Sequence, residues 1–179
     1  DFVMICTKTT PIRWGLYALE RFLRTADDTG AVMVYSDYYS LIKEDNEAAK
    51  VGGKEEKDGA ETHKLKAEQE AKTGKLIKHP VIDYQSGSLR DDFDFGSLWF
   101  IKAQALRDFI AQQDRADYQY AGLYDLRLYL SRVGEIFHLN EFLYTEDELD
   151  NRKSGEKQFD YVNPRNREVQ IEMEKACTQ

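Results

Sequence analysis

The sequence predicts an α/β domain with a mixed, mostly parallel sheet flanked by helices. Residues 2–6 and 31–35 are short, unbroken apolar runs, which are typical of strands buried on both faces. Between them, residues 12–26 place apolar side chains at three- and four-residue steps, as an amphipathic helix does. A strand, a helix and a strand in this order form a βαβ unit, whose two strands run parallel.

The sequence also predicts where the first helix begins and ends. Pro11 suits the first turn of a helix, because its missing N–H would have no helical partner there. Gly30 suits the left-handed conformation that commonly ends a helix. The side chains expected to face the core are Leu16, Leu19, Phe22, Leu23 and Ala26.

Residues 43–78 differ in composition from the rest of the chain. They are mostly Lys, Glu, Ala, Gly, Asp and Thr, and they contain no Phe, Trp or Tyr. Such a segment cannot bury enough apolar surface to offset its ordering entropy, so we expect a solvated excursion within a single domain over 1–179. After it we expect strands at 98–101, 135–139 and 142–144, helices at 104–113 and 123–133, and a last helix that begins at Asn163-Pro164. The inward side chains expected on these helices are Leu106, Phe109, Ile110, Leu123, Leu126, Leu130, Val133, Val169 and Met173.

Charge and hydropathy exclude several classes of protein. The net charge of −8 argues against nucleic-acid binding, because phosphate contacts require a surface of lysine and arginine. No apolar run approaches the roughly 20 residues of a membrane-spanning helix. Cys6 and Cys177 lack metal-ligand spacing and are expected to be free, buried thiols of a cytoplasmic protein. The chain opens within a strand and ends within a helical pattern, so we expect it to be part of a longer protein.

The first candidate site is Ser36-Asp37-Tyr38-Tyr39, directly after a predicted buried strand. Ligands of open α/β sheets bind beyond the carboxyl ends of the strands. Asp37 could hold a divalent cation there, and the tyrosines could stack on a sugar or a base. The alternative is that Asp37 caps a turn while the tyrosines cover the sheet edge.

The second candidate site is the acidic segment over residues 90–97. Asp92 and Asp94 alternate with apolar side chains, which predicts a strand with one buried face and both acids on the other. Clustered carboxylates repel one another unless a cation, an arginine or solvent relieves the repulsion. Gly96 permits close approach of a ligand, and Ser97 follows it. The alternative is an acidic turn anchored by Arg90.

The third candidate is Asp125, on the polar side of the helix predicted over 123–133. A carboxylate at a cleft can act as a general base toward an acceptor hydroxyl. Otherwise Asp125 is a surface charge, or pairs with Arg127 or Arg132.

A fourth candidate is the polar loop over 145–157, where Arg152 and Lys153 could neutralise a diphosphate leaving group. The alternative is a solvated loop. The three histidines, His63, His79 and His138, are scattered and form no ligand pair, and we assign them no role.

Several segments, taken in order, resemble family 2 glycosyltransferases. Residues 98–106 are similar to the strand, basic residue and helix of that family, and residues 121–128 resemble its acid-rich helix start. Residues 134–139 and 142–144 resemble the strand and the closing Leu-Tyr that follow. Residues 1–38 resemble the family's strand, metal-motif turn, helix and next strand.

The resemblance implies a GT-A fold, a nucleotide-diphosphate-sugar donor, a Mg²⁺ or Mn²⁺ ion and inverting transfer to a saccharide or lipid-linked acceptor. It places this chain in the later, acceptor-side part of the catalytic domain, so that we expect the chain alone to be inactive. The candidate metal ligands are Asp37 and Asp92. The candidate catalytic residues are Asp125, Asp92 and Asp94, and the candidate substrate-binding residues are Asp37, Tyr38, Tyr39, Gly96, Ser97, Trp99, Arg152 and Lys153.

Two positions differ from the family pattern. Thr7-Lys8-Thr9 stands where the metal-binding D-x-D motif is expected, and Leu123 stands where the family carries its base aspartate. Asp125 matches the family's second, more often structural, aspartate. Asp37 or the acids at 91–94 are possible substitutes for the missing carboxylates. The alternative function is a non-catalytic relative that binds a saccharide or a protein, with Tyr38, Tyr39 and Trp99 at an open groove.

Overall fold

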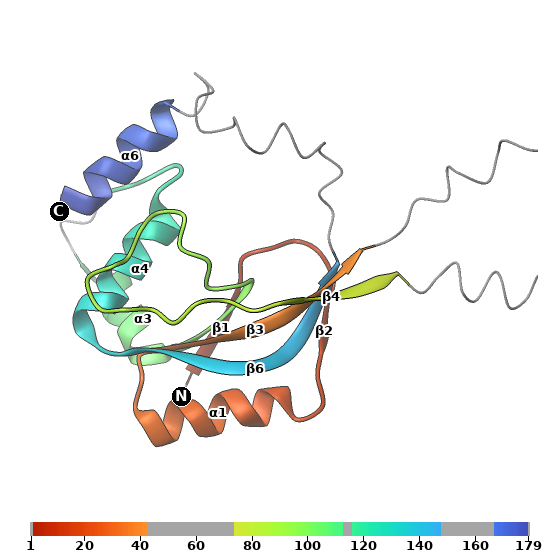
Figure 1. The fold of residues 1–179 in the computed structure, drawn as a ribbon. Helices are drawn as coiled ribbons and strands as arrows, with labels where there is room; N and C mark the ends of the chain where they lie inside the picture. The colour runs from red at the N-terminus through yellow and green to blue at the C-terminus, as the bar shows by residue number, and fades with distance from the viewer. Residues whose placement is uncertain (1, 43–73, 113–115, 148–166, 179) are drawn as a thin grey trace, which may run out of the picture.

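The structure, a computed structural model, describes residues 2–42, 74–112, 116–147 and 167–178. Its strands form a mixed sheet with helices packed around it (Figure 1). In chain order the elements are β1 (Phe2–Cys6), β2 (Ile12–Trp14), α1 (Ala18–Thr29), β3 (Met33–Ile42), β4 (Lys75–His79), β5 (Leu98–Lys102), α3 (Ala103–Ile110), α4 (Gly122–Val133), β6 (Ile136–Asp147) and α6 (Arg167–Thr178).

The sheet has the strand order β1-β5-β3-β6-β2, and β4 pairs with β3 beside this path. The α/β class with a mixed sheet is confirmed, but the expectation of mostly parallel pairing is wrong. Among the described strands, β3 and β6 form the parallel pair and every other pairing is antiparallel. β4, the next described strand after β3, pairs antiparallel with it, and such pairing needs no crossover helix.

Strands β1 and β3 run in the same direction, as the predicted βαβ unit requires, but β5 lies between them and is antiparallel to both. The expectation that residues 2–6 are buried on both faces is wrong. β1 is an edge strand, and Val3 and Met4 are exposed. The apolar run alone does not distinguish an edge strand from a central one.

β3 is the centre of the core, and residues 33–38 are all buried. Along one side β3 pairs with β6 throughout most of its length. Along the other it pairs with β5 at Met33 and Val34, and with β4 from Tyr38 onward. Along this second edge, no described strand pairs with residues 35–37, and the loop over residues 81–84 bonds to the side chains of Tyr35 and Asp37.

The predicted helix over 12–26 is wrong at its start. Residues 12–14 form β2, which pairs with the end of β6, and the helix begins at Ala18. Gly15 explains the break: its N–H donates to the carbonyl of Leu143, and an added Cβ would lie 2.8 Å from that oxygen. Pairing with β6 therefore outweighs the local helical pattern. Gly30 ends α1 with φ of 68°, as predicted.

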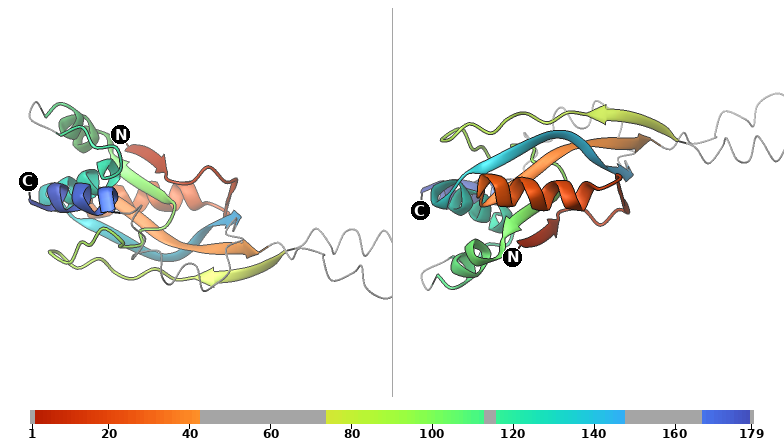
Figure 2. Two further views of the ribbon diagram at one scale, coloured as in Figure 1. Left: turned by 90° about the horizontal axis from the view of Figure 1, so that it is seen from above. Right: turned by 90° about the horizontal axis from the view of Figure 1, so that it is seen from below.

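α1 covers one face of the sheet, as the two views in Figure 2 show. Its inward face differs from the predicted one: Ala18, Phe22, Thr25 and Ala26 are buried. Phe22 and Ala26 were expected there, but the outward position of several leucines was not. The helix begins at Ala18, six residues later than the predicted start at residue 12, so Leu16 lies before it. Leu19 and Leu23 lie on the exposed face of the helix. The predicted inward residues that are exposed, here and on the later helices, are Leu16, Leu19, Leu23, Ile110, Leu123 and Val133.

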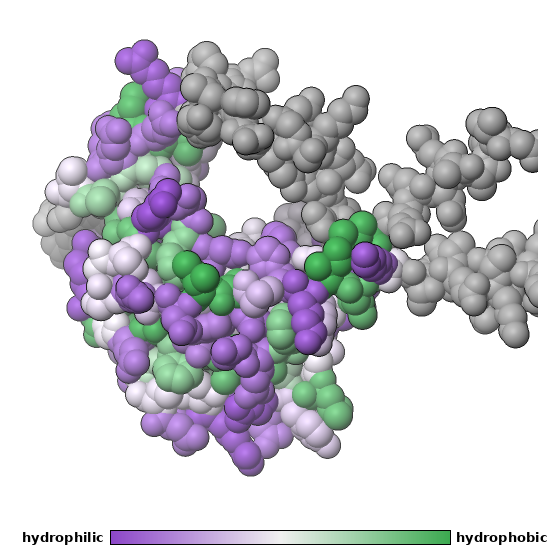
Figure 3. Space-filling model, viewed as in Figure 1, coloured by the Kyte–Doolittle hydropathy of each residue, from purple (hydrophilic) through white to green (hydrophobic). Residues whose placement is uncertain are grey.

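The polar excursion predicted over 43–78 ends earlier than expected, because residues 75–79 form β4. Leu76 and Ile77 supply the apolar, β-favouring side chains that the composition of the whole segment obscured, and both stay exposed. Figure 3 shows the corresponding apolar area over β4 on an otherwise largely hydrophilic face. Residues 43–73 lie outside the described part of the chain.

The two short strands predicted at 135–139 and 142–144 are one strand, β6, which continues to Asp147. Glu146 and Asp147 belong to this strand and are buried, although a polar loop was predicted from residue 145. The predicted start of the last helix at Asn163-Pro164 lies outside the described residues, and α6 is described from Arg167. Within the described ranges, no helix combines the length and apolar character that crossing a membrane requires.

The observed face of α1 predicts unequal effects for two neighbouring substitutions. Phe22→Ala removes a side chain that is 1% exposed, so it should lower the free energy of unfolding by about 3–5 kcal/mol. Leu23→Ala removes an exposed side chain and should cost less than about 1 kcal/mol. Urea denaturation of both variants measures the difference, and equal costs would contradict this orientation of the helix.

Candidate functional site

Asp37 lies at an irregularity in the central strand and organises the surrounding loop. The register between β3 and β6 shifts on both sides of Asp37, and its carboxylate is buried. Oδ1 accepts a hydrogen bond from the backbone N–H of Val81 at 2.9 Å and lies 3.0 Å from His138 Nε2. The alternative prediction was that Asp37 caps a turn. Its carboxylate instead accepts a hydrogen bond from a segment 44 residues away in the chain.

His138, to which we assigned no role, is held between two carboxylates. Its Nδ1 lies 2.6 Å from Asp83 Oδ1, while its other nitrogen faces Asp37. The ring also stacks on Tyr35, whose hydroxyl donates to the carbonyl of Ile82 and accepts from the N–H of Tyr84. Burial raises the pKa of the Tyr35 phenol, which therefore remains a neutral donor. These contacts tie residues 81–84 to β3 and β6.

The predicted metal ligands do not converge in this structure. Asp37 bonds to Val81 and His138, whereas Asp92 is exposed and pairs with Arg90. Across the residues that the structure describes, no three His, Cys, Asp or Glu side chains are grouped so that they could hold a metal ion. The metal site remains a prediction. The anchoring of the acidic segment by Arg90, offered as the alternative, agrees with the Arg90–Asp92 ion pair at 2.9 Å.

A second polar cluster lies at the carboxyl ends of β1, β3 and β6. Lys8, in the turn after β1, forms an ion pair with the buried carboxylate of Glu146 near the end of β6. The other oxygen of that carboxylate accepts the hydroxyl hydrogen bond of Ser97, which precedes β5. These three residues are up to 138 positions apart in the sequence, and no local motif connects them. Sequence analysis placed Lys8 at the expected position of the metal-binding motif but did not identify its partner.

Gly96 permits a close approach, as predicted, but the approaching group is a side chain of this chain. Its φ is 69°, and an added Cβ would lie 2.4 Å from the hydroxyl oxygen of Tyr144. That hydroxyl accepts the N–H of Ser97 at 2.7 Å, and the Tyr144 ring stacks on Tyr38. Ser97 is 1% exposed, so it contributes to the core of the cluster and not to an open surface.

Asp94 belongs to the same end of the sheet. Its carboxylate accepts the N–H of Gly96 at 2.7 Å and lies 3.0 Å from His79 Nε2. His79 in turn stacks on Tyr38. The strand predicted for this segment is not formed, but the predicted alternation of side chains is observed: Asp92 and Asp94 are exposed, and the phenylalanines between and after them pack inward.

The aromatic residues expected at an open groove are largely covered. Tyr38 and Trp99 are buried, and Tyr39 is half-buried with its ring against Phe142. The Trp99 indole donates to the carbonyl of Gly96 at 3.1 Å. Covering of the sheet by Tyr38 agrees with the alternative interpretation of this motif. Arg152 and Lys153 lie outside the described residues.

Arg127 fixes the acidic segment through its backbone. The guanidinium donates to the carbonyl of Asp91 at 2.7 Å and to that of Phe93 at 2.9 Å. It lies over the rings of Phe95, Trp99 and Tyr124 at 5.4–5.8 Å from their centroids. Burial lowers the pKa of Arg127, although nearby acidic groups oppose this effect.

Asp125 is buried in α4, so its predicted position on an exposed polar face is wrong. The helix is covered on more than one side, because α3 and α6 both pack against it. Arg127, one of the partners predicted for Asp125, directs two hydrogen bonds to the backbone carbonyls of residues 91 and 93. A role as a surface charge is excluded by this burial.

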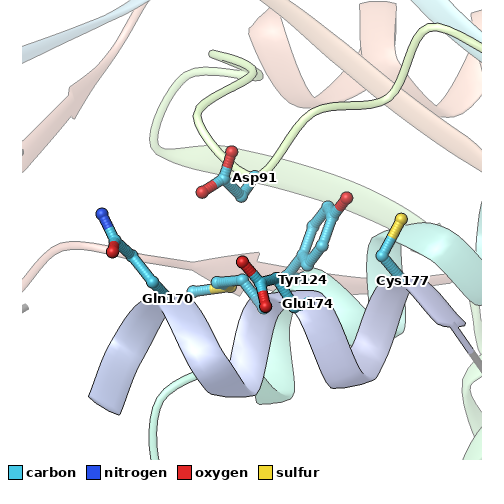
Figure 4. Close-up of a pocket in the computed structure, with 6 residues that line it drawn as sticks. Asp91, Tyr124, Gln170, Glu174 and Cys177 are labelled. Carbon is cyan, nitrogen blue, oxygen red and sulfur yellow. The ribbon is translucent and has the colours of Figure 1, made fainter. Parts of the chain in front are cut away.

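The acidic segment and α6 border an open cavity of about 420 Å³ at the start of α4, and Asp91, Glu174 and Cys177 in its lining are exposed (Figure 4). Asp91 enters it from the segment and Tyr124 from α4. In Figure 4 the Tyr124 hydroxyl lies between the Asp91 carboxylate and Cys177. The side chains that line the cavity are Asp91, Tyr124, Gln170, Met173, Glu174 and Cys177.

The environment of Tyr124 keeps its phenol neutral at physiological pH. Burial is the largest cause that raises its pKa to about 12, and the Cys177 side chain and the negative charge of Asp91 act in the same direction. Its neutral hydroxyl donates to the carbonyl of Leu89 at 3.4 Å. Cys177 itself is exposed, as is Cys6, so the predicted burial of these free thiols is wrong.

α6 is held at the cavity by an unusual helix cap. The carboxylate of Glu172 accepts hydrogen bonds from three consecutive backbone N–H groups, those of Gln119, Tyr120 and Ala121. These groups precede the first turn of α4, whose own cap residue makes no side-chain bond. The hydrogen bond from Tyr120 is the largest cause that lowers the pKa of Glu172. Glu172 is about 50 positions away in the sequence, yet it supplies the carboxylate that the N-terminus of α4 favours.

No protein-family model matches this chain, and no characterised protein matches its sequence.

Arg127→Met should loosen the acidic segment. The variant loses two charge-assisted hydrogen bonds to backbone carbonyls, so the free energy of unfolding should fall by about 2 kcal/mol. Amide exchange of residues 89–96 should accelerate more than exchange in β3. Arg127→Lys retains the charge but not the planar fork, and should give an intermediate effect. Unchanged protection of residues 89–96 in Arg127→Met would contradict the role assigned to this side chain.

Acidification should release α6 from α4. A carboxylate whose folded pKa is depressed stabilises the fold at pH values above its unfolded pKa of about 4.3, and this contribution is lost as pH falls through the folded pKa. We expect the amides of Tyr120 and Ala121 to lose exchange protection in that acidic range. Glu172→Gln should show reduced protection already at neutral pH and a flatter acid dependence. Identical acid profiles for both proteins would contradict the cap.

Proposed function

We propose that this chain is the acceptor-side part of a sugar-nucleotide-dependent glycosyltransferase, and that the cavity at the start of α4 binds the acceptor. One observation carries the proposal: Asp91 and Glu174 line one cavity beside Tyr124. The resemblance to family 2 glycosyltransferases expects an acceptor-activating acid at the start of this helix, where the sequence itself has Leu123. Asp91 lies in the acidic segment that was considered as a substitute.

The cavity has the components that acceptor activation requires. Asp91 is the proposed general base, because a carboxylate can remove the proton of an acceptor hydroxyl as that hydroxyl attacks the donor sugar. Arg127 holds the backbone of Asp91 in place, which limits the freedom of the base. Tyr124 offers a neutral hydroxyl and an aromatic face for the sugar ring. The Glu174 carboxylate offers a second group that can accept a hydrogen bond from the substrate.

The donor side of the proposed reaction lies at the carboxyl ends of the strands. Lys8 stands at the position where the resemblance expects the metal-binding motif, and its amino group is half-exposed. It could meet a donor diphosphate if its ion pair with Glu146 opens. The Mg²⁺ or Mn²⁺ ion is part of the proposal through the resemblance alone, because Asp37 and Asp92 bond to different partners in this structure. A GT-A fold, inverting transfer and a cytoplasmic location complete the proposal.

A non-catalytic relative that binds a saccharide is the second candidate. The observation that favours it is the separate engagement of the three predicted acids: Asp37 with His138, Asp92 with Arg90, and Asp94 with His79. A protein without a metal site could still use the cavity to hold a saccharide. Activity measurements distinguish the two candidates.

Asp91→Asn should abolish most of the transfer while the protein stays folded. With the protein expressed from its complete gene, uridine and guanosine diphosphate sugars as donors, Mn²⁺ and a panel of saccharides, we expect acceptor-dependent release of nucleoside diphosphate. Loss of the general base should lower kcat by about 10²- to 10⁴-fold. The backbone carbonyl that bonds to Arg127 is retained in the variant, so stability should change little.

Glu168→Gln is the matched control, because it removes one exposed charge from α6 outside the cavity. Its activity should equal that of the unmodified protein. If the panel yields no acceptor-dependent release, the transferase proposal fails and the binding relative is favoured. If Asp91→Asn is fully active, Asp91 is not the base.

A further inference from the structure

The cavity beside α4 has an excess of negative charge and of hydrogen-bond acceptors. Asp91 and Glu174 contribute carboxylates, and Gln170 contributes an amide oxygen. The Tyr124 hydroxyl already donates to the carbonyl of Leu89, and the other donors among the described lining residues are the Gln170 amide and the Cys177 thiol. A ligand that fits this lining must therefore bring donors of its own.

No basic side chain is among the described residues that line the cavity. Arg127 lies next to Tyr124, but it is buried and its guanidinium donates to the carbonyls of residues 91 and 93. Arg90 pairs with Asp92. The charge of Lys175, the residue after Glu174, acts on Glu172. The Arg127 charge interacts with Asp91 from the buried side, and no cation among the described lining residues lies on the open side of the cavity between the two carboxylates.

The apolar part of the lining also suits a cation. An ammonium group is attracted to the face of an aromatic ring, here Tyr124, and Met173 adds apolar surface for a sugar ring. The effect of the Asp91 charge on the Tyr124 phenol shows that the field of this carboxylate reaches into the cavity. The volume of about 420 Å³ lies within the roughly 300–1,000 Å³ of small-molecule sites.

We propose that the cavity binds a saccharide that carries a protonated amine, with the ammonium group between Asp91 and Glu174 and the sugar ring against Tyr124 and Met173. The inference deepens the proposed function and rests on it for one point, that this cavity is the acceptor site. It adds the class of acceptor: an amino sugar in place of a neutral one.

Glucosamine and glucose are matched probes, because they share the ring and differ at one position, which carries a protonated amine in glucosamine. Isothermal titration of the present chain at low ionic strength should give at least about tenfold tighter binding of glucosamine. Asp91→Asn and Glu174→Gln should each weaken glucosamine binding by about tenfold and leave glucose unaffected. Circular dichroism of each variant checks that the fold is retained.

Glu168→Gln is again the control and should bind glucosamine as the unmodified chain does. Equal weakening by all three variants would show that glucosamine follows the net charge of −8 and not the cavity, and would overturn the inference. Equal binding of the two sugars, or binding of neither, would also overturn it. Amine-selective binding without any sugar transfer would contradict the proposed enzyme while the inference stands. Sugar transfer together with equal binding of glucosamine and glucose would overturn the inference while the proposed enzyme stands.

Discussion

The buried guanidinium of Arg127 is the interaction on which the arrangement of the acidic segment depends. One side chain of α4 holds two backbone carbonyls of that segment and lies over three aromatic rings of the core. A buried charge is costly unless hydrogen bonds compensate it, so the segment and α4 are expected to keep this contact together. As a consequence, Asp91 is directed to the cavity beside α6, while Asp94 lies with His79 at the carboxyl ends of the strands.

The two polar regions of the molecule differ in how far their charges are satisfied internally. On the sheet, Glu146 near the end of β6 is bonded to Lys8 and Ser97, and Asp37 in the middle of β3 is bonded to Val81 and His138. Such pairing is what burial of these acids requires. In the cavity beside α4, Asp91 and Glu174 face an open volume, and the described part of the chain contributes no cation to its lining. The latter region is therefore the one that leaves chemistry to a ligand, although the usual ligand edge of an α/β sheet is the former.

Sequence periodicity identified most of the helices and strands, and the errors in these predictions have physical causes. β3, β5, α3 and α4 lie close to where apolar spacing placed them, because each buries a regular face. β2 was missed, since its pairing with β6 is a tertiary effect that the helical pattern of residues 12–26 hides. The acidic segment was identified as important, but its support by Arg127 and its meeting with α6 depend on contacts between distant residues. Glu172 and Glu174 were not singled out, because an acidic helical face is usually only solvated.

Mapping of ligand contacts by two-dimensional NMR tests the central claim most directly, because it locates the site independently of activity. Titration of the isotope-labelled chain with an amino sugar should shift the amide signals of Tyr124, Gln170 and Met173, with those of Lys8 and Ser97 unchanged. Shifts confined to Lys8, Ser97 and their neighbours would place the ligand at the carboxyl ends of the strands and contradict the assignment of the cavity beside α4.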